Sequence, residues 1–291
     1  MNIQTELEQD LKLVNSHLVS FLPKPAAGAE HVYDAAVYSL ENGGKRIRPL
    51  LCLAFAKAYG ADREAALAYA CGVEFIHTYS LIHDDLPCMD NDDMRRGKPS
   101  CHIAFGEATA LLAGDLLLTE AFGVLAESGL SAQQNAGAVS VLAACAGGRG
   151  MIGGQVLDLK YEQASPTLEE ICAVHRSKTG ALIYAACALG CIAAGAGEEA
   201  LQTAKEYAYA LGMAFQIRDD ILDVVGDAQK LGKPVGSDAE NDKTTYVSLV
   251  GLEQAEKDVQ LFTQRAVDAV RPVDKNGVLT HIASLLADRQ A

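Results

Sequence analysis

Apolar and charged residues alternate at helical spacing from the start of the chain. Between residues 3 and 22, apolar positions stand three or four residues apart, and most positions between them are polar or charged. That period is typical of a helix that buries one face, and Pro23 and Pro25 mark its end. The apolar positions are Ile3, Leu7, Leu11, Val14 and Leu18.

The remainder of the chain continues this pattern. Apolar runs bounded by glycine, proline or charged residues predict further helices, and no strand-like alternation flanks a hairpin turn. The predicted ranges are 30–41, 45–60, 62–83, 106–127, 132–146, 150–161, 167–196, 198–225, 252–270 and 277–289. Because the connections are short and no linker divides them, we expect an all-α fold, a single large helical bundle over residues 1–291.

The composition favours helices that pack closely. Aromatic residues make up 6% of the chain and tryptophan is missing, whereas alanine, leucine and glycine are plentiful. The uncharged run from Gly180 to Gly197 approaches the length of a membrane span, but its small residues favour a buried helix. The first helix is charged and contains no apolar signal region. We therefore expect no transmembrane segment.

The eight cysteines show neither a CxxC pair nor zinc-ligand spacing. They lie mostly inside apolar runs, which is typical of small core residues in a reducing compartment. We expect a cytoplasmic protein.

The charge balance limits the partners. The net charge is −14 and the isoelectric point about 4.9, which argues against a nucleic-acid or anionic-membrane surface. A protein of this charge that binds phosphates needs metal ions and local basic clusters.

One acidic stretch, from His83 to Arg96, reads HDDLPCMDNDDMRR. Its carboxylates suit Mg²⁺, and its paired arginines match phosphate. On a straight helix Asp84 and Asp90 would point roughly 120° apart, so the break at Pro87 is needed to bring them to one ion. Taken alone, such a cluster is more often a solvated helix face.

A second acidic group lies in FQIRDDILD. Gln216, Asp219 and Asp223 share one helix face, with Asp220 beside it, and apolar residues surround them. Two acid-rich helices that face each other would hold several metal ions with a diphosphate between them.

Basic clusters accompany these acids. Any one of them would ordinarily be surface charge, but together they favour a site for two anionic substrates. The clusters contain Lys45, Arg46 and Arg48; Arg95 and Arg96; Arg176 and Lys178; and Lys233 with Lys243. His77 lies two turns before Asp84, where it is either a lining residue or a core histidine, and His102 is expected to be structural.

With these residues in view, the chain resembles the short-chain trans-prenyl diphosphate synthases, and most closely the bacterial farnesyl diphosphate synthases. The resemblance covers nearly the whole chain. It rests on GGKRIRP, IHTYSLIHDDLPCMDNDDMRRGKPSCH, AFGEATALLAGD, GGQVLDL, KTGAL, FQIRDDILD, GKPVGSD and NDKTTY.

The resemblance implies a helical bundle around a deep apolar cavity, a homodimer, and condensation of isopentenyl diphosphate with an allylic diphosphate. It implies three Mg²⁺ ions, two held by Asp84 and Asp90 and one by Asp219, with Asp85, Asp220 and Asp223 nearby. It further assigns Arg95, Lys178 and Lys233 to the allylic diphosphate, and Lys45, Arg48, His77 and Arg96 to isopentenyl diphosphate. Thr179 and Gln216 would line the carbocation, and Lys243 would support the second acidic group.

Product length is the open part of this interpretation. In the family it depends on bulk near the fifth residue before the first aspartate, here Tyr79, with Ser80 following. An aromatic ring there implies a fifteen-carbon product; the alternative is that Tyr79 is merely a core residue. The alternatives are a geranylgeranyl diphosphate synthase, a terpene cyclase and a non-catalytic synthase subunit.

Overall fold

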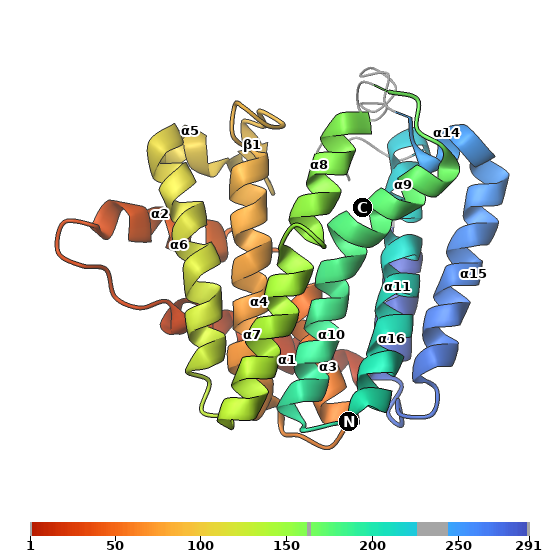
Figure 1. The fold of residues 1–291 in the computed structure, drawn as a ribbon, viewed down its shortest axis with the longest axis horizontal. Helices are drawn as coiled ribbons and strands as arrows, with labels where there is room; N and C mark the ends of the chain where they lie inside the picture. The colour runs from red at the N-terminus through yellow and green to blue at the C-terminus, as the bar shows by residue number, and fades with distance from the viewer. Residues whose placement is uncertain (1, 162–163, 226–243, 290–291) are drawn as a thin grey trace.

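The structure is a computed structural model that describes residues 2–161, 164–225 and 244–289. It is a helical bundle whose long helices run in roughly the same direction (Figure 1). The helices from the amino terminus are α1 (Ile3–His17), α2 (Glu30–Glu41), α3 (Ile47–Ala58), α4 (Arg63–Asp84), α5 (Cys101–Phe105), α6 (Glu107–Ala126), α7 (Ala132–Ala146) and α8 (Met151–Tyr161). They are followed by α9 (Leu168–Val174), α10 (Ala181–Ala193), α11 (Glu198–Val225), α14 (Tyr246–Val250), α15 (Leu252–Val270) and α16 (Val278–Ala287).

The all-α expectation is confirmed, with three local differences. The range 167–196, expected as one helix, is divided by a π-helical segment, η2 (His175–Gly180), between α9 and α10. The expected first helix ends at His17 and is followed by a 3₁₀ turn, η1 (Val19–Phe21). Short elements of five residues or fewer, α5 and α14, were not expected because one turn carries too little periodicity to be recognised.

A two-stranded antiparallel ladder also departs from the expectation. Strands β1 (Met94–Arg95) and β2 (Lys98–Pro99) pair across a two-residue turn. Arg96 and Gly97 form that turn, and both have positive φ, as this class of tight hairpin requires. Arginine at such a position is uncommon, which is why the turn could not be recognised from sequence.

Helix α10 lies at the centre of the bundle and is almost fully buried, as its uncharged sequence predicted. It packs against α3 through Gly190, where an added Cβ would lie 2.3 Å from the carbonyl oxygen of Cys52. The backbones can approach this closely only because glycine has no side chain. The packing through small residues inferred from composition is therefore confirmed here.

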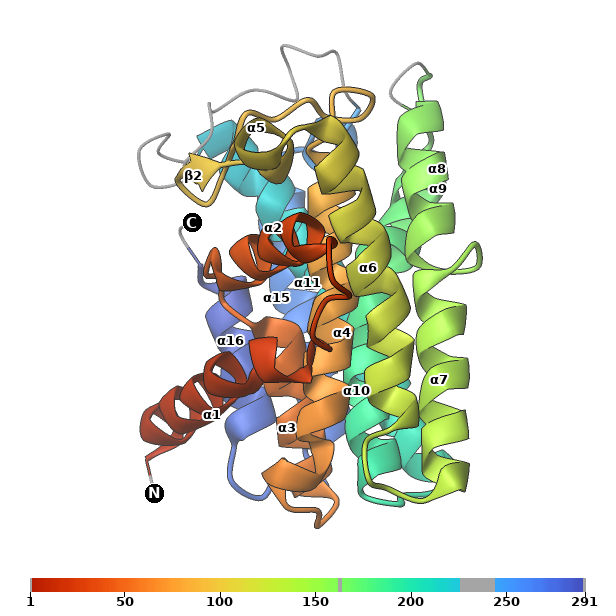
Figure 2. The same cartoon turned by 90° about the vertical axis from the view of Figure 1, so that its left-hand side faces the viewer.

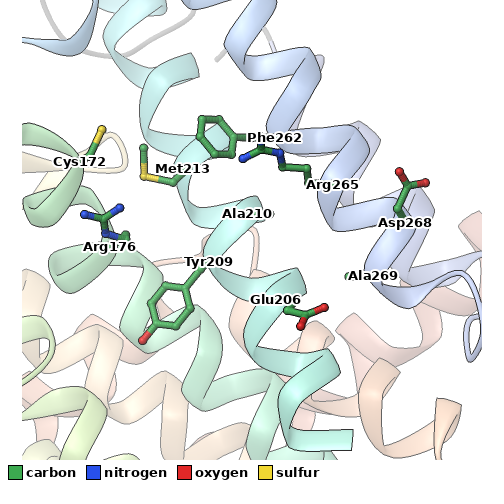
Figure 3. Close-up of a pocket in the computed structure, with 10 residues that line it drawn as sticks. All are labelled: Cys172, Arg176, Glu206, Tyr209, Ala210, Met213, Phe262, Arg265, Asp268 and Ala269. Atoms are coloured by element: carbon green, nitrogen blue, oxygen red, sulfur yellow. The ribbon is translucent and has the colours of Figure 1, made fainter. Parts of the chain in front are cut away.

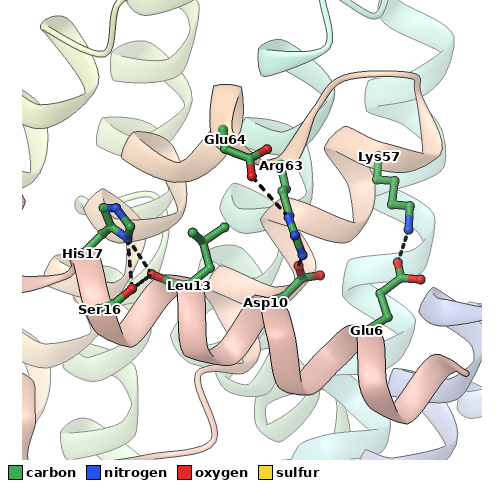
Figure 4. Close-up of polar contacts among 8 residues, drawn as sticks. All are labelled: Glu6, Asp10, Leu13, Ser16, His17, Lys57, Arg63 and Glu64. Atoms are coloured by element: carbon green, nitrogen blue, oxygen red, sulfur yellow. Dashed lines mark hydrogen bonds and ion pairs between the residues drawn. The ribbon is translucent and has the colours of Figure 1, made fainter. Parts of the chain in front are cut away.

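Helix α1 is held to the bundle by two partly buried ion pairs (Figure 4). Glu6 pairs with Lys57 of α3, and Asp10 accepts a hydrogen bond from Arg63 at 2.9 Å. Figure 2 shows α1 and α2 in front of α3 and α4. The amino-terminal helices thus cover α3 and α4, which both lead into the site described below.

Among the described residues, three helical stretches are long and apolar enough to cross a membrane by length and composition alone: 63–84, 107–126 and 132–161. The bundle buries 78% of the apolar window of the first, but 39% and 28% of the other two. The absence of a transmembrane segment stays a prediction.

The eight cysteines all lie in described parts of the chain and none forms a disulfide. Most are buried, as expected, whereas Cys88 is exposed and Cys172 is partly buried.

Candidate active site

The two acidic groups come together at one end of the bundle. Helices α4 and α11 both end at the upper edge of Figure 1, beside β1 and α14. We call the end of α4 with the following loop, residues 84–96, the first wall. The face of α11 from Gln216 to Asp223 is the second wall.

The first wall turns back on itself directly after the helix. The backbone N–H of Asp90 donates to the carbonyl oxygen of Asp84 at 2.8 Å, which closes the loop around Pro87. The predicted break therefore brings Asp90 back to Asp84. Burial, opposed by Lys178 and aided by the nearby Asp90, raises the pKa of Asp84 to about 6. An anionic group in this position is stabilised by a cation.

Asp85 points into the protein and braces the loop. Its carboxylate is 2% exposed and accepts from the Arg95 guanidinium, with Nε at 2.9 Å from Oδ1. Arg95 also donates to Asp92 at 3.1 Å. Burial would lower the pKa of Arg95, but the Asp85 carboxylate outweighs this and raises it. Asp85 is thus engaged by Arg95, next to the metal-site candidates Asp84 and Asp90.

The second wall is restrained by residues distant in sequence. The Thr179 hydroxyl donates to Gln216 Oε1 at 2.8 Å, and the backbone N–H of Tyr246 donates to Asp220 at 2.7 Å. Asp219 forms an ion pair with Arg289, near the end of the described chain. The third predicted acid of this wall, Asp223, is 3% exposed.

Lys178 connects the two walls. It lies in η2, forms an ion pair with Asp158 of α8 at 2.6 Å, and lowers the pKa of Asp84 on the first wall. It also lines a cavity of about 210 Å³ together with Asp158, Gln216, Asp219 and Asp220. Gly154 permits the close approach of α8 to η2, because a Cβ there would lie 2.3 Å from the backbone nitrogen of Lys178.

Asp158 was missed as an individual residue, although its motif GGQVLDL was recognised. A lone acid among apolar residues carries no signal until its lysine partner is known. Tyr246 and Arg289 were also missed, because one acts through its backbone and the other lies at the chain end.

A group of basic residues, which we call the cationic group, begins at the glycine turn before α3. Arg46 has a left-handed backbone, with φ of 49°, and its buried guanidinium forms an ion pair with Glu74 of α4 at 2.8 Å. This pair joins the turn to α4. It leaves the neighbours Lys45 and Arg48 to serve other groups.

Arg48, His77 and Arg96 lie within electrostatic reach of one another. Burial lowers the pKa of Arg48 to about 10, with Glu74 opposing the shift. Burial and the charges of Arg48 and Arg96 lower the pKa of His77 well below its usual value, so this imidazole is neutral. Of these groups, Arg48 Nε lacks a hydrogen-bond partner among the described residues, which is typical of a donor held for an anion.

Arg96 and Lys45 complete this cationic group. Arg96 donates to the carbonyl oxygen of Gly43, and the guanidinium lies where a side chain on Gly44 would be. Burial and the nearby Arg289 lower the pKa of Lys45, while Asp219 opposes the shift. Lys45 therefore lies between the cationic group and the second wall.

Tyr79 is buried on α4, one turn before His83, and their rings form a T-shaped contact with centroids 5.7 Å apart. Its hydroxyl has no hydrogen-bond partner within the described ranges, and burial raises its pKa to about 12. Ser80 donates to the carbonyl oxygen of His77 at 2.9 Å. His102, as expected, is buried in a local contact with Ser100.

Lys233 and Lys243 lie outside the described residues. The other predicted site residues gather at the same end of the bundle, around the first wall, the second wall or the cationic group.

The donor set fits a hard divalent ion. Each wall offers a few carboxylates, and within the described ranges no three acid, histidine or cysteine side chains form a complete metal cage. Mg²⁺ is commonly held by one or two carboxylates while water and phosphate supply its other oxygens. The raised pKa of Asp84 marks a carboxylate that such an ion would stabilise.

Comparison with known proteins agrees with this geometry. Residues 29–284 match the model of the polyprenyl synthetase family. The chain is 46% identical over 257 residues to a farnesyl diphosphate synthase of Bacillus subtilis, covering 87% of each chain. It is 41% identical to a geranylgeranyl diphosphate synthase of Cyanophora paradoxa, over 99% of this chain and 97% of the relative.

A solved structure has the same fold. The geranyltransferase of Helicobacter pylori, crystallised with magnesium and isoprenyl diphosphate, superposes with a TM-score of 0.85 and is 31% identical. The alignment covers 98% of this chain and 96% of that one.

Proposed function

The chain belongs to the polyprenyl synthetase family and is a prenyltransferase, and we propose that it makes farnesyl diphosphate from isopentenyl diphosphate and dimethylallyl or geranyl diphosphate. The observation that carries the proposal is the position of Lys178 between two aspartate walls, while Lys45 of a separate cationic group lies within electrostatic reach of Asp219 on the second wall. The space between the walls suits a metal-bound diphosphate, and the cationic group suits a diphosphate without a metal.

We assign the allylic diphosphate to the space between the walls. Three Mg²⁺ ions would neutralise it, two at Asp84 and Asp90 and one at Asp219, and would stabilise the charge that develops on the leaving group. Lys178, Arg95 and Lys233 add positive charge to the same group. Lys243 would support the second wall, as the family resemblance implies.

Isopentenyl diphosphate fits the cationic group formed by Lys45, Arg48, His77 and Arg96. These side chains can neutralise a diphosphate without a metal, and neutral His77 can donate a hydrogen bond to it. The allylic C–O bond breaks as diphosphate leaves, the double bond of isopentenyl diphosphate attacks the allylic carbon, and the released diphosphate would accept the proton that is lost. Thr179 and Gln216, already hydrogen-bonded to each other, would face the carbocation with oxygen dipoles.

The catalytic unit is one polyprenyl synthase domain over residues 1–291, and we propose that it acts as a cytoplasmic homodimer. Leu111 and Leu112 of α6 are 46% and 51% exposed, and α6 buries only 39% of its apolar window. A second copy packed on this face would cover that apolar surface.

The reaction is tested by incubating the purified chain with Mg²⁺, isopentenyl diphosphate and each allylic starter, followed by chromatography of the products. We expect elongation to fifteen carbons. Diphosphate release without elongation would indicate a terpene cyclase. No turnover alone, with activation of a partner chain, would indicate a non-catalytic subunit.

Product length is tested at Tyr79. Replacement by alanine removes a buried ring at the position expected to close the cavity, so Tyr79→Ala should give products longer than fifteen carbons. Tyr79→Phe is the matched control and should keep the product length, because the hydroxyl has no described partner. An unchanged product from Tyr79→Ala would place the floor of the cavity elsewhere.

A further inference from the structure

A second cavity, of about 600 Å³, lies between η2, the amino-terminal half of α11, and α15 (Figure 3). Its volume is within the range of small-molecule sites. Its lining shares no residue with the cavity around Lys178. It is therefore a separate site and needs its own explanation.

The floor of this cavity is apolar and aromatic. Met213 of α11 is 4% exposed, and Tyr209 stacks on Tyr184 with ring centroids 5.9 Å apart. Phe262 of α15 and Cys172 of α9 complete the apolar walls. An apolar ligand bound here would leave water and contact carbon and sulfur atoms of these side chains.

Two guanidiniums reach the cavity from opposite sides. Arg176 extends from η2, and Arg265 extends from α15 with its guanidinium carbon 5.3 Å from the centroid of the Phe262 ring (Figure 3). In the described part of the chain neither forms an ion pair with a carboxylate.

The acids of the same cavity are already engaged. Asp268 forms an ion pair with Arg271, and Glu206 accepts a hydrogen bond from Gln202 at 2.7 Å. The remaining described arginines without a carboxylate partner include Arg48 and Arg96, the predicted diphosphate ligands. Unpaired arginine is thus a feature that this cavity shares with the proposed substrate site.

We propose that this cavity binds a small amphipathic anion, an alkyl or isoprenoid chain with a single phosphate or carboxylate head. The chain would lie on Met213, Tyr209 and Phe262, and the head would be held by Arg176 and Arg265. The cavity lies beside α15, on the side of the bundle away from α6, so the proposed dimer leaves it accessible (Figure 1).

The test uses decyl phosphate with the full-length protein in EDTA, which prevents metal-dependent diphosphate binding. The measurement is the rate at which iodoacetamide alkylates Cys172, followed by peptide mass spectrometry. Exposed Cys88, in the first wall, is the internal reference for ligand bound at the aspartates. Decanol and inorganic phosphate are the controls for chain and head alone, and decanoate separates a carboxylate from a phosphate head.

We expect decyl phosphate to slow alkylation of Cys172 and not of Cys88, and neither control to do so. Arg265→Gln should raise the decyl phosphate concentration that gives half-maximal protection about tenfold, which is the effect of losing one charged hydrogen bond. Lys257→Gln, a cation of α15 that is paired with Glu253 and does not line the cavity, should leave it unchanged. Equal protection by decanol, unchanged protection in Arg265→Gln, or no protection of Cys172 would overturn the proposal.

Discussion

The two acidic walls of the candidate active site are built in different ways. The first is local: Asp84, Asp85 and Asp90 come from one stretch, and Arg95 of that stretch braces it. The second is a helix face whose side chains are held by Thr179, Tyr246 and Arg289. The first wall can therefore keep its shape independently, whereas the second depends on the assembly of several distant segments.

Removing a metal-site acid should have the largest effect. Asp84→Ala should reduce kcat by about three orders of magnitude, because charge stabilisation of the leaving group is lost. Asp219→Ala should reduce it less, since we assign one ion to Asp219 and two to the first wall. Steady-state kinetics with geranyl diphosphate checks the order. Near-normal rates in either variant would contradict the metal assignment.

Breaking the brace of the first wall should have the next largest effect. Asp85→Asn removes a buried charge from Arg95 and should lower kcat about 10- to 100-fold, as expected for a lost charged hydrogen bond. Asp92→Asn, whose side chain is 53% exposed, is the matched control and should change kcat little. Equal losses in both would show that Asp85 has no special bracing role.

The second wall offers a smaller effect of opposite sign. Arg289 is ion-paired with Asp219 and therefore competes with a metal ion for that carboxylate. Arg289→Gln should lower the half-saturating Mg²⁺ concentration by up to about fivefold, the value of a partly exposed ion pair. The measurement is the initial rate against Mg²⁺ at saturating substrates. A higher Mg²⁺ requirement would mean that Arg289 contributes directly to diphosphate binding.

The smallest effect is a pH dependence of stability without metal. The folded-state pKa of Asp84, about 6, exceeds its usual value of 3.8, so the folded protein binds more protons between these values. Stability from this group is present below pH about 4 and is lost as pH rises to about 6.

In EDTA, the thermal unfolding midpoint of the wild type should fall relative to that of Asp84→Asn as the pH increases from 4 to 6. Added Mg²⁺ at pH 7 should reverse the wild-type loss, since binding stabilises the folded state. A difference between the two proteins that does not vary with pH would contradict the raised pKa.

Sequence reasoning succeeded where a signal was local and repeated. Helices α6 and α11 were predicted to within one residue at each end because their patterns extend over many turns. The break at Pro87 was predicted as well, because proline has a defined effect on a helix. The chemistry of the two acidic groups, inferred from residue types and spacing, stays a prediction.

Sequence reasoning failed where a contact joins distant segments. The pairing of Lys178 with Asp158 spans twenty residues and two helices, and that of Asp219 with Arg289 spans most of the carboxyl-terminal third. Neither residue type nor spacing announces such a partner. The αL conformation of Arg46 could not be predicted for the same reason, since it accompanies an ion pair with the buried Glu74, a residue of another helix.

The π-helical segment η2 differs from its neighbours in the number of residues per turn. A π turn contains one more residue than an α turn, and this extra residue changes the direction of every side chain that follows on the same helix. Arg176 and Lys178, both within this segment, line different cavities. At this point of the chain a one-residue deletion would be more damaging than most substitutions, because it would alter the register of two sites while leaving their chemistry intact.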